Sequence, residues 1–414
     1  MNPLFFNKKK IINDPVYGFI NIPDDIIFDL IEHPYFQRLR RIKQLGLTYL
    51  VYPGATHTRF NHAIGAMHLM NEAMEVLRSK GHSVSEREAV AANTAILLHD
   101  IGHGPFSHAL ESGLISGVHH ELISEVLMNR MNREMGGKLD LALKIYRDQY
   151  EKKYFHQMVS GQLDVDRLDY LNRDSFFTGV SEGIIGSERI IKMLNLCNGE
   201  LVVEHKGIYS IEKFILARRL MYWQVYLHKT VLSAEKLLIN ILRRARWLAE
   251  RGEELFAPAS LHFFLYNTIN SKNFDDDTVI NHFIELDDDD IFSAIKVWKN
   301  HSDKVLATLC SNLQNRRLYR IEMSSKPISE KRSEEIMEKV MEQFSFSKEE
   351  ASYFVFSESI SNSAYVLTQD KIKILLRDGS VVDFTDASSI MNPELMSHTE
   401  TQYFLCYPKE CAGC

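Results

Sequence analysis

The sequence predicts a mainly α-helical protein, with a helical bundle core followed by a small α+β lobe at the C-terminus. Apolar residues recur at helical spacing across residues 24–300, whereas strand-like segments with a turn signal begin only after about Ser324. The chain has 414 residues, of which 45% are hydrophobic, so it can bury a large core. We expect an N-terminal segment over residues 1–50, a helical domain over 51–320 and the C-terminal lobe over 321–414.

The first elements expected are amphipathic helices. Apolar residues recur at three-residue steps from Phe36 to Leu45, with basic residues on the other faces. The next apolar pattern begins at His62 and is stopped by Gly81. The second helix therefore starts with a side chain that can bind a metal ion or a proton.

The following helix ends in a cluster of titratable side chains. A capping box at residues 85–88 predicts its start, and the glycines that follow the cluster break it. His99 and Asp100 are therefore expected in its last turn, where a rigid helix fixes their position. His103 and His108 are expected on the loop just beyond, from which they could reach a substrate.

Two later helices carry polar side chains among apolar ones. Asp166, Tyr170 and Asp174 fall at i, i+4 and i+8, on one stripe of a helix within residues 161–180. A further helix over residues 211–246 interleaves basic and aromatic residues, which suits phosphates beside a stacked base or sugar. An amphipathic surface helix whose long basic side chains snorkel would show the same pattern.

The C-terminal lobe is predicted to contain one polar helix over residues 334–344. A hairpin follows, with strands over 371–376 and 381–385 joined by an Asp-Gly turn. Residues 403–407 are predicted as a further strand. Because this part mixes a helix with short strands, we expect an α+β lobe.

Composition and charge exclude several classes of protein. A net charge of −7 argues against binding to nucleic acid, so any anionic ligand must be held by local Arg and Lys clusters. No signal peptide is expected, and no apolar run approaches the roughly 18–20 residues that span a bilayer. The five cysteines are odd in number and scattered, as in a reducing compartment. We expect a cytoplasmic protein without a membrane or nucleic-acid partner.

Four residues from three places in the sequence have the pattern of a site for one divalent metal ion. A distant His, then a His-Asp pair, then a later Asp in a helical setting is how two imidazoles and two carboxylates grip one ion. The two carboxylates cancel its charge, and the mix of nitrogen and oxygen donors suits Fe, Mn, Zn or Co better than Ca. The expected ligands are His62, His99, Asp100 and Asp166.

Sequence blocks along the first 230 residues reinforce this pattern; the most specific are Arg59-Phe60-Asn61-His62, the ten residues from His99 to His108, Asp164 to Tyr170, and Tyr226 to Lys229. Together they resemble the HD-domain phosphohydrolases, specifically the deoxynucleoside triphosphate triphosphohydrolase branch (dNTPases, dGTPase-like). The chain is most similar to the SAM- and HD-domain members of that branch, and no SAM domain is expected here. The resemblance implies that the helical core is an HD-domain bundle.

The reaction implied by this resemblance is metal-assisted attack of water on the α-phosphorus of a dNTP, releasing the deoxynucleoside and inorganic triphosphate. The ion at the HD site could be Fe, Mn, Zn or Ni, and Mg could join through the substrate phosphates. His108 is the candidate to protonate the departing 5′-oxygen, because imidazole can hold a proton near neutral pH. His103, His120 and Glu111 are then supporting groups around the phosphates.

Substrate contacts are also implied by the resemblance. Gln44 and Leu45 match residues that check the sugar 3′-hydroxyl, and Tyr226 matches a residue close to the nucleoside. Arg167 stands where the family has Lys, which keeps the charge but alters the reach. The remaining substrate-binding residues implied are Arg59, Tyr170, Asp174 and Arg218.

Family members that are activated by nucleotides bind them between subunits, so the resemblance implies a homo-oligomer, a dimer or tetramer. Residues at positions matching a first activator pocket are Lys10, Asn13, Glu32, Gln37 and Arg40. Glu32 stands where an Asp is expected to read guanine, and it can still accept hydrogen bonds. Lys206 and Lys229 also match, but Glu204 replaces an Arg that would face phosphate in a second pocket, which reverses the charge.

Two other functional classes stay open. An HD phosphodiesterase acting on cyclic or oligonucleotide substrates would use the same metal group, although the matches at Arg59, Arg218 and Gln44 favour a triphosphate. A catalytically idle protein that binds nucleotides for regulation is the second alternative. The complete set of four metal ligands argues against it.

Overall fold

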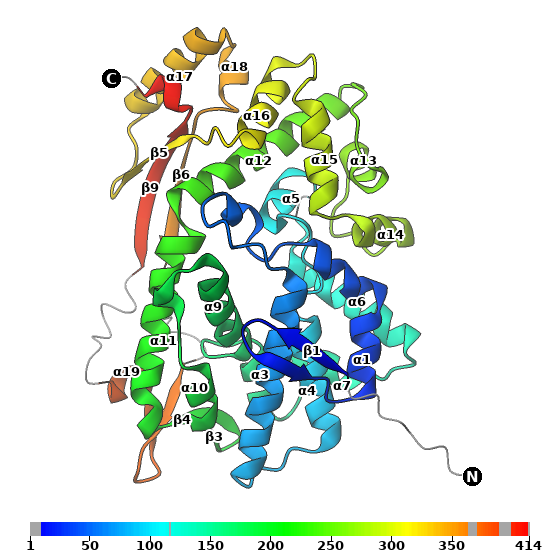
Figure 1. Cartoon of the computed structure of the whole chain (residues 1–414), viewed down its shortest axis with the longest axis vertical. Helices are drawn as coiled ribbons and strands as arrows, with labels where there is room; N and C mark the ends of the chain where they lie inside the picture. Colours follow the sequence, from blue (N-terminus) through cyan, green and yellow to red (C-terminus); the bar gives the residue numbers. More distant parts are fainter. Residues whose placement is uncertain (1–9, 116, 363–370, 389–398, 413–414) are drawn as a thin grey trace.

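The computed structural model describes residues 10–115, 117–362, 371–388 and 399–412, without the side chains of His108, Glu111, Ser112 and Asn362. Helices make up most of the molecule, and three small sheets accompany them (Figure 1). This confirms the predicted mainly α fold class. In the described part of the chain, no helix is both long enough and apolar enough to cross a membrane.

Three helices form the centre of the bundle: α3 (Arg59–Ser79), α4 (Glu86–Leu98) and α9 (Val165–Thr178). Helix α3 packs against both of the others. Gly65 permits the close contact with α9, since a Cβ at this position would lie 2.0 Å from an Asp169 carboxylate oxygen. The helices expected at these three places are therefore confirmed, and they bring together residues far apart in the sequence.

The start of α4 follows the predicted capping box. The Ser85 hydroxyl accepts from the Glu88 N–H, and the Glu88 carboxylate accepts from the Ser85 N–H at 2.8 Å. The helix ends at Leu98, two residues earlier than expected, so His99 is its C-cap and Asp100 lies in the turn that follows. Both residues nevertheless leave the same end of a buried helix.

The expected helix from Phe36 to Leu45 is wrong as a continuous element. The segment forms the short α2 (Pro34–Gln37) and then the 3-10 helix η1 (Arg38–Arg41). Apolar residues at three-residue steps match the 3-10 period of 3.0 residues per turn better than the α period of 3.6. The chain therefore turns tightly here, and a second 3-10 helix, η2 (Gly46–Leu50), follows.

The helix expected over residues 211–246 is also interrupted. Helix α11 (Ile208–Met221) continues into a π-helix, η5 (Tyr222–Tyr226), and α12 (Lys229–Ala249) begins after His228. His228 has a non-helical backbone with a ψ of 126°, and its side chain accepts a hydrogen bond from the Thr230 N–H. This N-cap starts a new helix. π-helical turns are rare and occur frequently at functional sites.

The remaining helices surround this centre and extend beyond it (Figure 1). They are α1 (Asp25–Glu32), α5 (Ser107–Gly113), α6 (His120–Glu134), α7 (Asp140–Tyr146), α8 (Tyr154–Val159), η3 (Ser181–Gly183), α10 (Ser187–Met193), η4 (His205–Gly207), α13 (Ala259–Tyr266), α14 (Asp277–Glu285), α15 (Asp288–Trp298), α16 (Lys304–Gln314), α17 (Glu330–Phe344), α18 (Lys348–Ala351), α19 (Phe384–Ala387) and η6 (Lys409–Cys411). Helix α17 confirms the polar helix predicted in the C-terminal region.

The strands form three sheets. They are β1 (Ile11–Asp14) with β2 (Gly18–Asn21); β3 (Leu194–Cys197), β4 (Glu200–Glu204), β7 (Lys373–Leu375) and β8 (Val381–Asp383); and β5 (Arg320–Ser324), β9 (Glu400–Tyr407) and β6 (Phe356–Asn362). The predicted hairpin is confirmed as β7 and β8, with Gly379 at a φ of 87° in its turn. Strand β7 pairs in parallel with β4, so the region over 321–414 contributes to two separate sheets.

Candidate metal centre and substrate pocket

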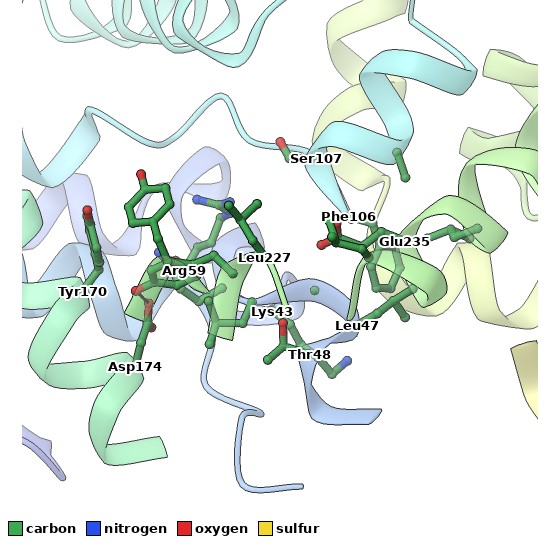
Figure 2. A pocket seen from close by; sticks show the side chains of 18 of the residues that line it. Lys43, Leu47, Thr48, Arg59, Phe106, Ser107, Tyr170, Asp174, Leu227 and Glu235 are labelled. Atoms are coloured by element: carbon green, nitrogen blue, oxygen red, sulfur yellow. Dashed lines mark hydrogen bonds between the residues drawn. The ribbon is translucent and has the colours of Figure 1, made fainter. Parts of the chain in front are cut away.

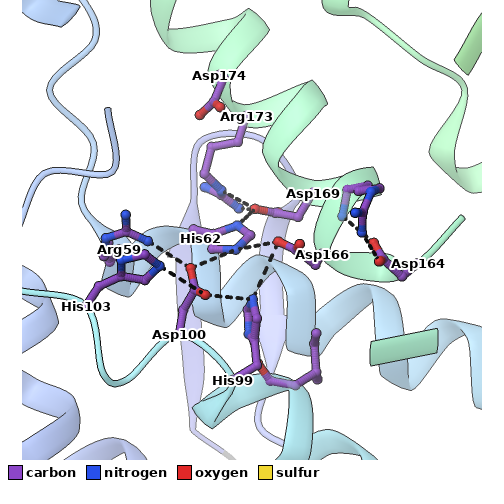
Figure 3. A network of polar contacts seen from close by, with 12 residues as sticks. Arg59, His62, His99, Asp100, His103, Asp164, Asp166, Asp169, Arg173 and Asp174 are labelled. Carbon is purple, nitrogen blue, oxygen red and sulfur yellow. Dashed lines mark hydrogen bonds and ion pairs between the residues drawn. The ribbon is translucent and has the colours of Figure 1, made fainter. Parts of the chain in front are cut away.

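The four residues expected to bind a metal ion meet at the ends of three elements (Figure 3). His62 comes from α3, His99 and Asp100 from the end of α4, and Asp166 from the first turn of α9. One Asp166 carboxylate oxygen lies 3.1 Å from the His62 Nε2 and 3.5 Å from the His99 Nε2. An Asp100 oxygen lies 3.4 Å from the His99 Nε2. The structure therefore brings all four donor groups together.

The chemistry of this group fits a cation. The Nδ1 atoms of the two rings are already engaged, by Asp169 at 2.7 Å in His62 and by the Ile96 carbonyl at 2.6 Å in His99. If each Nδ1 carries the proton, each Nε2 turns a lone pair toward carboxylate oxygens, which is repulsive unless a cation lies between them. Among the described residues, neither buried Nε2 makes a hydrogen bond. The residues present therefore suit a divalent metal ion.

The negative charge around His62 also favours a bound cation. Burial lowers the pKa of this imidazole, but the neighbouring Asp166 and Asp169 carboxylates outweigh burial and raise it to about 10. Without a metal ion, the carboxylates would thus hold a proton on the ring. The carboxylates are therefore balanced either by a proton on the His62 ring or by a metal ion, and binding of the metal ion must displace that proton.

Behind His62, a buried chain of charged groups holds the ring in place. Asp169 accepts from His62 and from Arg173, whose Nε lies at 2.9 Å, and Arg173 also donates to Asp14 at 2.7 Å. Asp169, Arg173 and Asp14 are all almost completely buried. Sequence reasoning missed Asp169, since it lies off the stripe of Asp166 and its neighbours at i+4 and i+8. Its one signal was its spacing, four residues before Arg173.

We expect Asp169→Asn to weaken metal binding by about 10–100-fold, the usual cost of losing the hydrogen-bond partner of a metal-bound histidine. An amide can no longer hold the His62 ring with a negative charge, whereas all four ligands remain. Competition with a metal chelator measures the change in affinity. Glu72→Gln is the matched control. Glu72 lies on α3, as His62 does, but it contacts His68 of the same helix, outside the site. Equal affinity in wild type and Asp169→Asn would contradict this role.

A second group of donors lies beside the first. Atoms of Asp100, His103 and His120 lie within 4.8 Å of one another, and the two imidazole rings stack with centroids 3.8 Å apart. Burial and the Arg59 cation lower the pKa of His103 to about 3. Its ring is therefore neutral at neutral pH. Arg59 itself donates to Asp100 at 2.8 Å, so it stands directly at the centre.

The loop that carries His103 is held by an arginine that sequence reasoning missed. Arg38 is fully buried and donates to the carbonyl oxygens of Ile101 and His103, at 2.8 Å each. Gly102 packs just as tightly, since a Cβ there would lie 2.2 Å from the His120 carbonyl oxygen. Nothing in the sequence distinguishes Arg38 from the other basic residues around it. The loop is thus fixed by a residue more than sixty positions earlier in the chain.

A pocket of about 510 Å³ opens next to this centre (Figure 2). Seven of the eight residues expected to bind substrate line it: Gln44, Leu45, Arg59, Arg167, Tyr170, Asp174 and Tyr226. The eighth, Arg218, is not among its lining residues and lies on α11, with its guanidinium 6.0 Å from the centroid of the Tyr222 ring. Tyr222 does line the pocket, because the π-helix η5 turns it and Tyr226 toward the same space.

Asp174 ties one wall of this pocket together. One of its carboxylate oxygens lies 2.8 Å from the Nε2 of buried His57, and the other accepts from the Tyr226 hydroxyl at 2.7 Å. Arg167 is held in a similar way by the buried Asp164, three residues earlier. The pocket therefore has a rigid polar wall, and His57 and Asp164 are two contributors that sequence reasoning did not identify.

The candidate proton donor and one supporting group fall on helix α5. His108 was expected on a loop, but its backbone is helical, in the first turn of α5 (Ser107–Gly113), so that expectation is wrong. The helix starts here because Phe106, with a φ of 48°, reverses the chain direction just before it. The side chains of His108 and Glu111 lie outside the described residues.

The residues that match activator-binding positions lie just before β1 and on β1, α1, α2 and η1. Lys10 places its ammonium group 3.7 Å from the centroid of the Phe28 ring on α1, and Asn13 lies on β1. Arg40 donates to Gln37 at 2.9 Å, and Glu32 is exposed on α1. At the second position, the Glu204 carboxylate pairs with Lys80 at 2.7 Å and with Lys206 at 2.9 Å. Lys206 thus forms an ion pair with Glu204, the acidic residue that stands where the family has Arg.

Comparison with known proteins identifies related families over the segments that form this site. The chain matches the HD domain over residues 59–174 and the HD associated region over residues 185–254. It is 32% identical to the uncharacterized protein YwfO of Bacillus subtilis, over 98% of this chain and 94% of that protein. It is 28% identical to the deoxynucleoside triphosphate triphosphohydrolase SAMHD1 homolog of Dictyostelium discoideum, over 75% of this chain and 59% of that protein.

Among solved structures, the crystal structure of a phosphohydrolase from Bacteroides thetaiotaomicron is similar over nearly the whole chain. Its TM-score is 0.94 at 54% identity, covering 97% of this chain and 100% of that one. All four candidate metal ligands fall within the region that matches the HD domain, and Tyr222 and Tyr226 fall within the HD associated region. The metal centre and the aromatic wall of the pocket therefore belong to the two matched regions.

Proposed function

The chain belongs to the HD-domain phosphohydrolase family, and we propose that it is a metal-dependent dNTP triphosphohydrolase. In this reaction a deoxynucleoside triphosphate is cleaved to the deoxynucleoside and inorganic triphosphate. The observation that carries the proposal is the pocket, which joins the metal group and two arginines to a wall of tyrosines and apolar side chains. Such a pocket has one end for phosphates and another for a nucleoside.

Two arginines support a phosphate-binding end. Arg59 and Arg167 both line the pocket, and each keeps a buried Nε–H without a hydrogen-bond acceptor among the described residues. A triphosphate brings about four negative charges, which arginines can bind through charge-assisted hydrogen bonds. Arg59 is already oriented by Asp100, so little rearrangement is needed to bind the substrate.

A sugar-binding role is supported at Gln44. Its side-chain oxygen is buried at the pocket and has no hydrogen-bond donor among the described residues. The 3′-hydroxyl of a deoxyribose would supply that donor. Tyr170 and Tyr226 lie with ring centroids 6.0 Å apart in an edge-to-face arrangement, which leaves apolar surface for the sugar ring.

Chemistry at the α-phosphorus needs an activated water and a proton for the leaving oxygen. A divalent ion held by His62, His99, Asp100 and Asp166, of the Fe, Mn, Zn or Ni type, would polarise a phosphoryl oxygen and acidify a water molecule. Arg59 stabilises negative charge that develops on the phosphoryl oxygens. We assign protonation of the 5′-oxygen to His108. His103 is less suited because its ring is neutral at neutral pH.

The products distinguish this proposal from the alternatives. Purified protein is incubated with each of the four dNTPs and with added Mn, Fe or Mg in ¹⁸O-labelled water. Attack at the α-phosphorus puts one ¹⁸O atom into inorganic tripolyphosphate and none into the deoxynucleoside. Release of pyrophosphate with a nucleoside monophosphate, or cleavage of a cyclic or oligonucleotide substrate alone, would favour another phosphohydrolase. Nucleotide binding without turnover would favour a regulatory protein.

We also predict that the protein is a homo-oligomer, a dimer or a tetramer. The resemblance implies this, and large apolar side chains are exposed on adjoining elements, among them Phe176 (57%), Ile184 (54%) and Tyr209 (64%). Clustered exposed apolar side chains mark protein interfaces. Light scattering with and without dGTP measures the mass in solution. A monomer under both conditions would refute the prediction.

A further inference from the structure

The end of the pocket that lies away from the phosphate-binding residues contains one carboxylate. Leu232, Glu235, Leu238 and Ile239 recur on one face of α12, and all four line the pocket. In Figure 2, Glu235 lies beyond Phe106 and Leu47, opposite the end that holds Tyr170 and Asp174. A single acidic residue thus interrupts a stripe that is otherwise apolar.

Glu235 has no partner that would explain its position. Its side chain is half-buried in the pocket wall and makes no hydrogen bond or ion pair with any other residue in the described ranges. Burial raises the pKa of its carboxyl group to about 7. A carboxylate in an apolar setting is costly unless something satisfies it. Exceptions to a consistent apolar pattern are expected at functional sites. The missing partner is therefore expected in the ligand.

We infer that Glu235 recognises the nucleobase of the substrate and selects guanine. This inference rests on the proposed function, because the phosphates are placed at Arg59 and Arg167, which leaves the base at the far, apolar end. An ionised carboxylate offers only acceptors. Guanine has two adjacent donors on its Watson–Crick edge, N1–H and the 2-amino group, so both carboxylate oxygens can be used.

The other bases fit this carboxylate less well. Adenine and cytosine each offer one amino group next to a ring nitrogen acceptor, which would face a carboxylate oxygen. Thymine has a single N–H between two carbonyl groups. A site built to accept hydrogen bonds discriminates strongly against a ligand that leaves its buried polar group unpaired. Glu235 would therefore disfavour adenine, cytosine and thymine as well as bind guanine.

The test compares substrates in the metal-loaded full-length enzyme, with kcat/KM measured for the four dNTPs and for dITP, whose base lacks the 2-amino group. Wild type should prefer dGTP, and dITP should be a poorer substrate. Glu235→Gln should lower kcat/KM for dGTP by about 5–150-fold, the range of one bidentate base contact. It should change the other dNTPs by less than about 3-fold and abolish the difference between dGTP and dITP.

Lys236→Gln is the matched control, because Lys236 does not line the pocket and instead pairs with Glu358. It should leave the preference among dNTPs unchanged. The inference is overturned if wild type shows no preference for dGTP, or if Glu235→Gln lowers kcat/KM equally for all four dNTPs. An equal loss of kcat/KM for all four dNTPs would mean that Glu235 contacts the sugar or supports the fold rather than the base. If wild type releases no tripolyphosphate from any dNTP, the proposed function itself fails and the inference falls with it.

Discussion

His99→Ala is expected to abolish metal binding and catalytic activity together. Wild type should contain about one transition-metal ion per chain when purified without added metal, and the variant should contain almost none. The His99 Nε2 is buried within 3.5 Å of carboxylate oxygens of Asp100 and Asp166, and alanine leaves His62 as the only imidazole of the group. Removing a ligand should cost more than the 10–100-fold loss in affinity that follows removal of a ligand's hydrogen-bond partner.

Elemental analysis and a tripolyphosphate assay measure the two losses. Alanine suits the end of α4, because it has high helix propensity, so circular dichroism should show an unchanged fold. His68→Ala is the matched control, since His68 lies on α3 and contacts Glu72 away from the centre. Full activity of the wild type in the presence of a strong chelator, with no metal found, would contradict a metal mechanism.

The structure brings together the four residues that the sequence pattern predicts as metal ligands. These residues lie at helix starts and ends, and helix boundaries are marked by local signals such as the capping box before α4. Most of the predicted substrate residues also reach one pocket, because they share helix stripes with the ligands or lie on the turns after η1. Local periodicity and motif spacing predicted the metal-ligand group, whereas the substrate residues were implied by the family resemblance.

The supporting groups could not be located in this way, because each depends on packing between distant segments. Asp14 reaches Arg173 across 159 positions, and Arg38 reaches the loop of His103 across 65. Neither pair follows from helical periodicity. The π-helix that ends at Tyr226 is equally hidden, since a single π-helical turn is too short to show a periodicity of its own in the sequence. The parallel pairing of β4 with β7 joins segments about 170 residues apart.

His108→Ala should lower kcat by roughly 10²–10⁴-fold, the range for a lost general acid, while KM changes little. This expectation rests on the resemblance and on the backbone position of His108, directly after Ser107, which lines the pocket. The metal content should stay at that of wild type, because none of the four ligands is altered. Steady-state kinetics and elemental analysis of the same preparation measure both quantities, and the retained metal separates this variant from His99→Ala.

A change in the leaving group tests the role itself. A dNTP analogue with sulfur in place of the bridging 5′-oxygen releases a thiolate, which departs without needing a proton. If His108 is the general acid, the deficit of His108→Ala should shrink sharply with this analogue, whereas a variant that is merely misfolded would show the same deficit with both substrates. Near-normal turnover of the ordinary substrate, or loss of the metal ion, would show that the assignment is wrong. His103 and His120 would then be the candidates for the same pair of measurements, since they stack beside Asp100 at the centre.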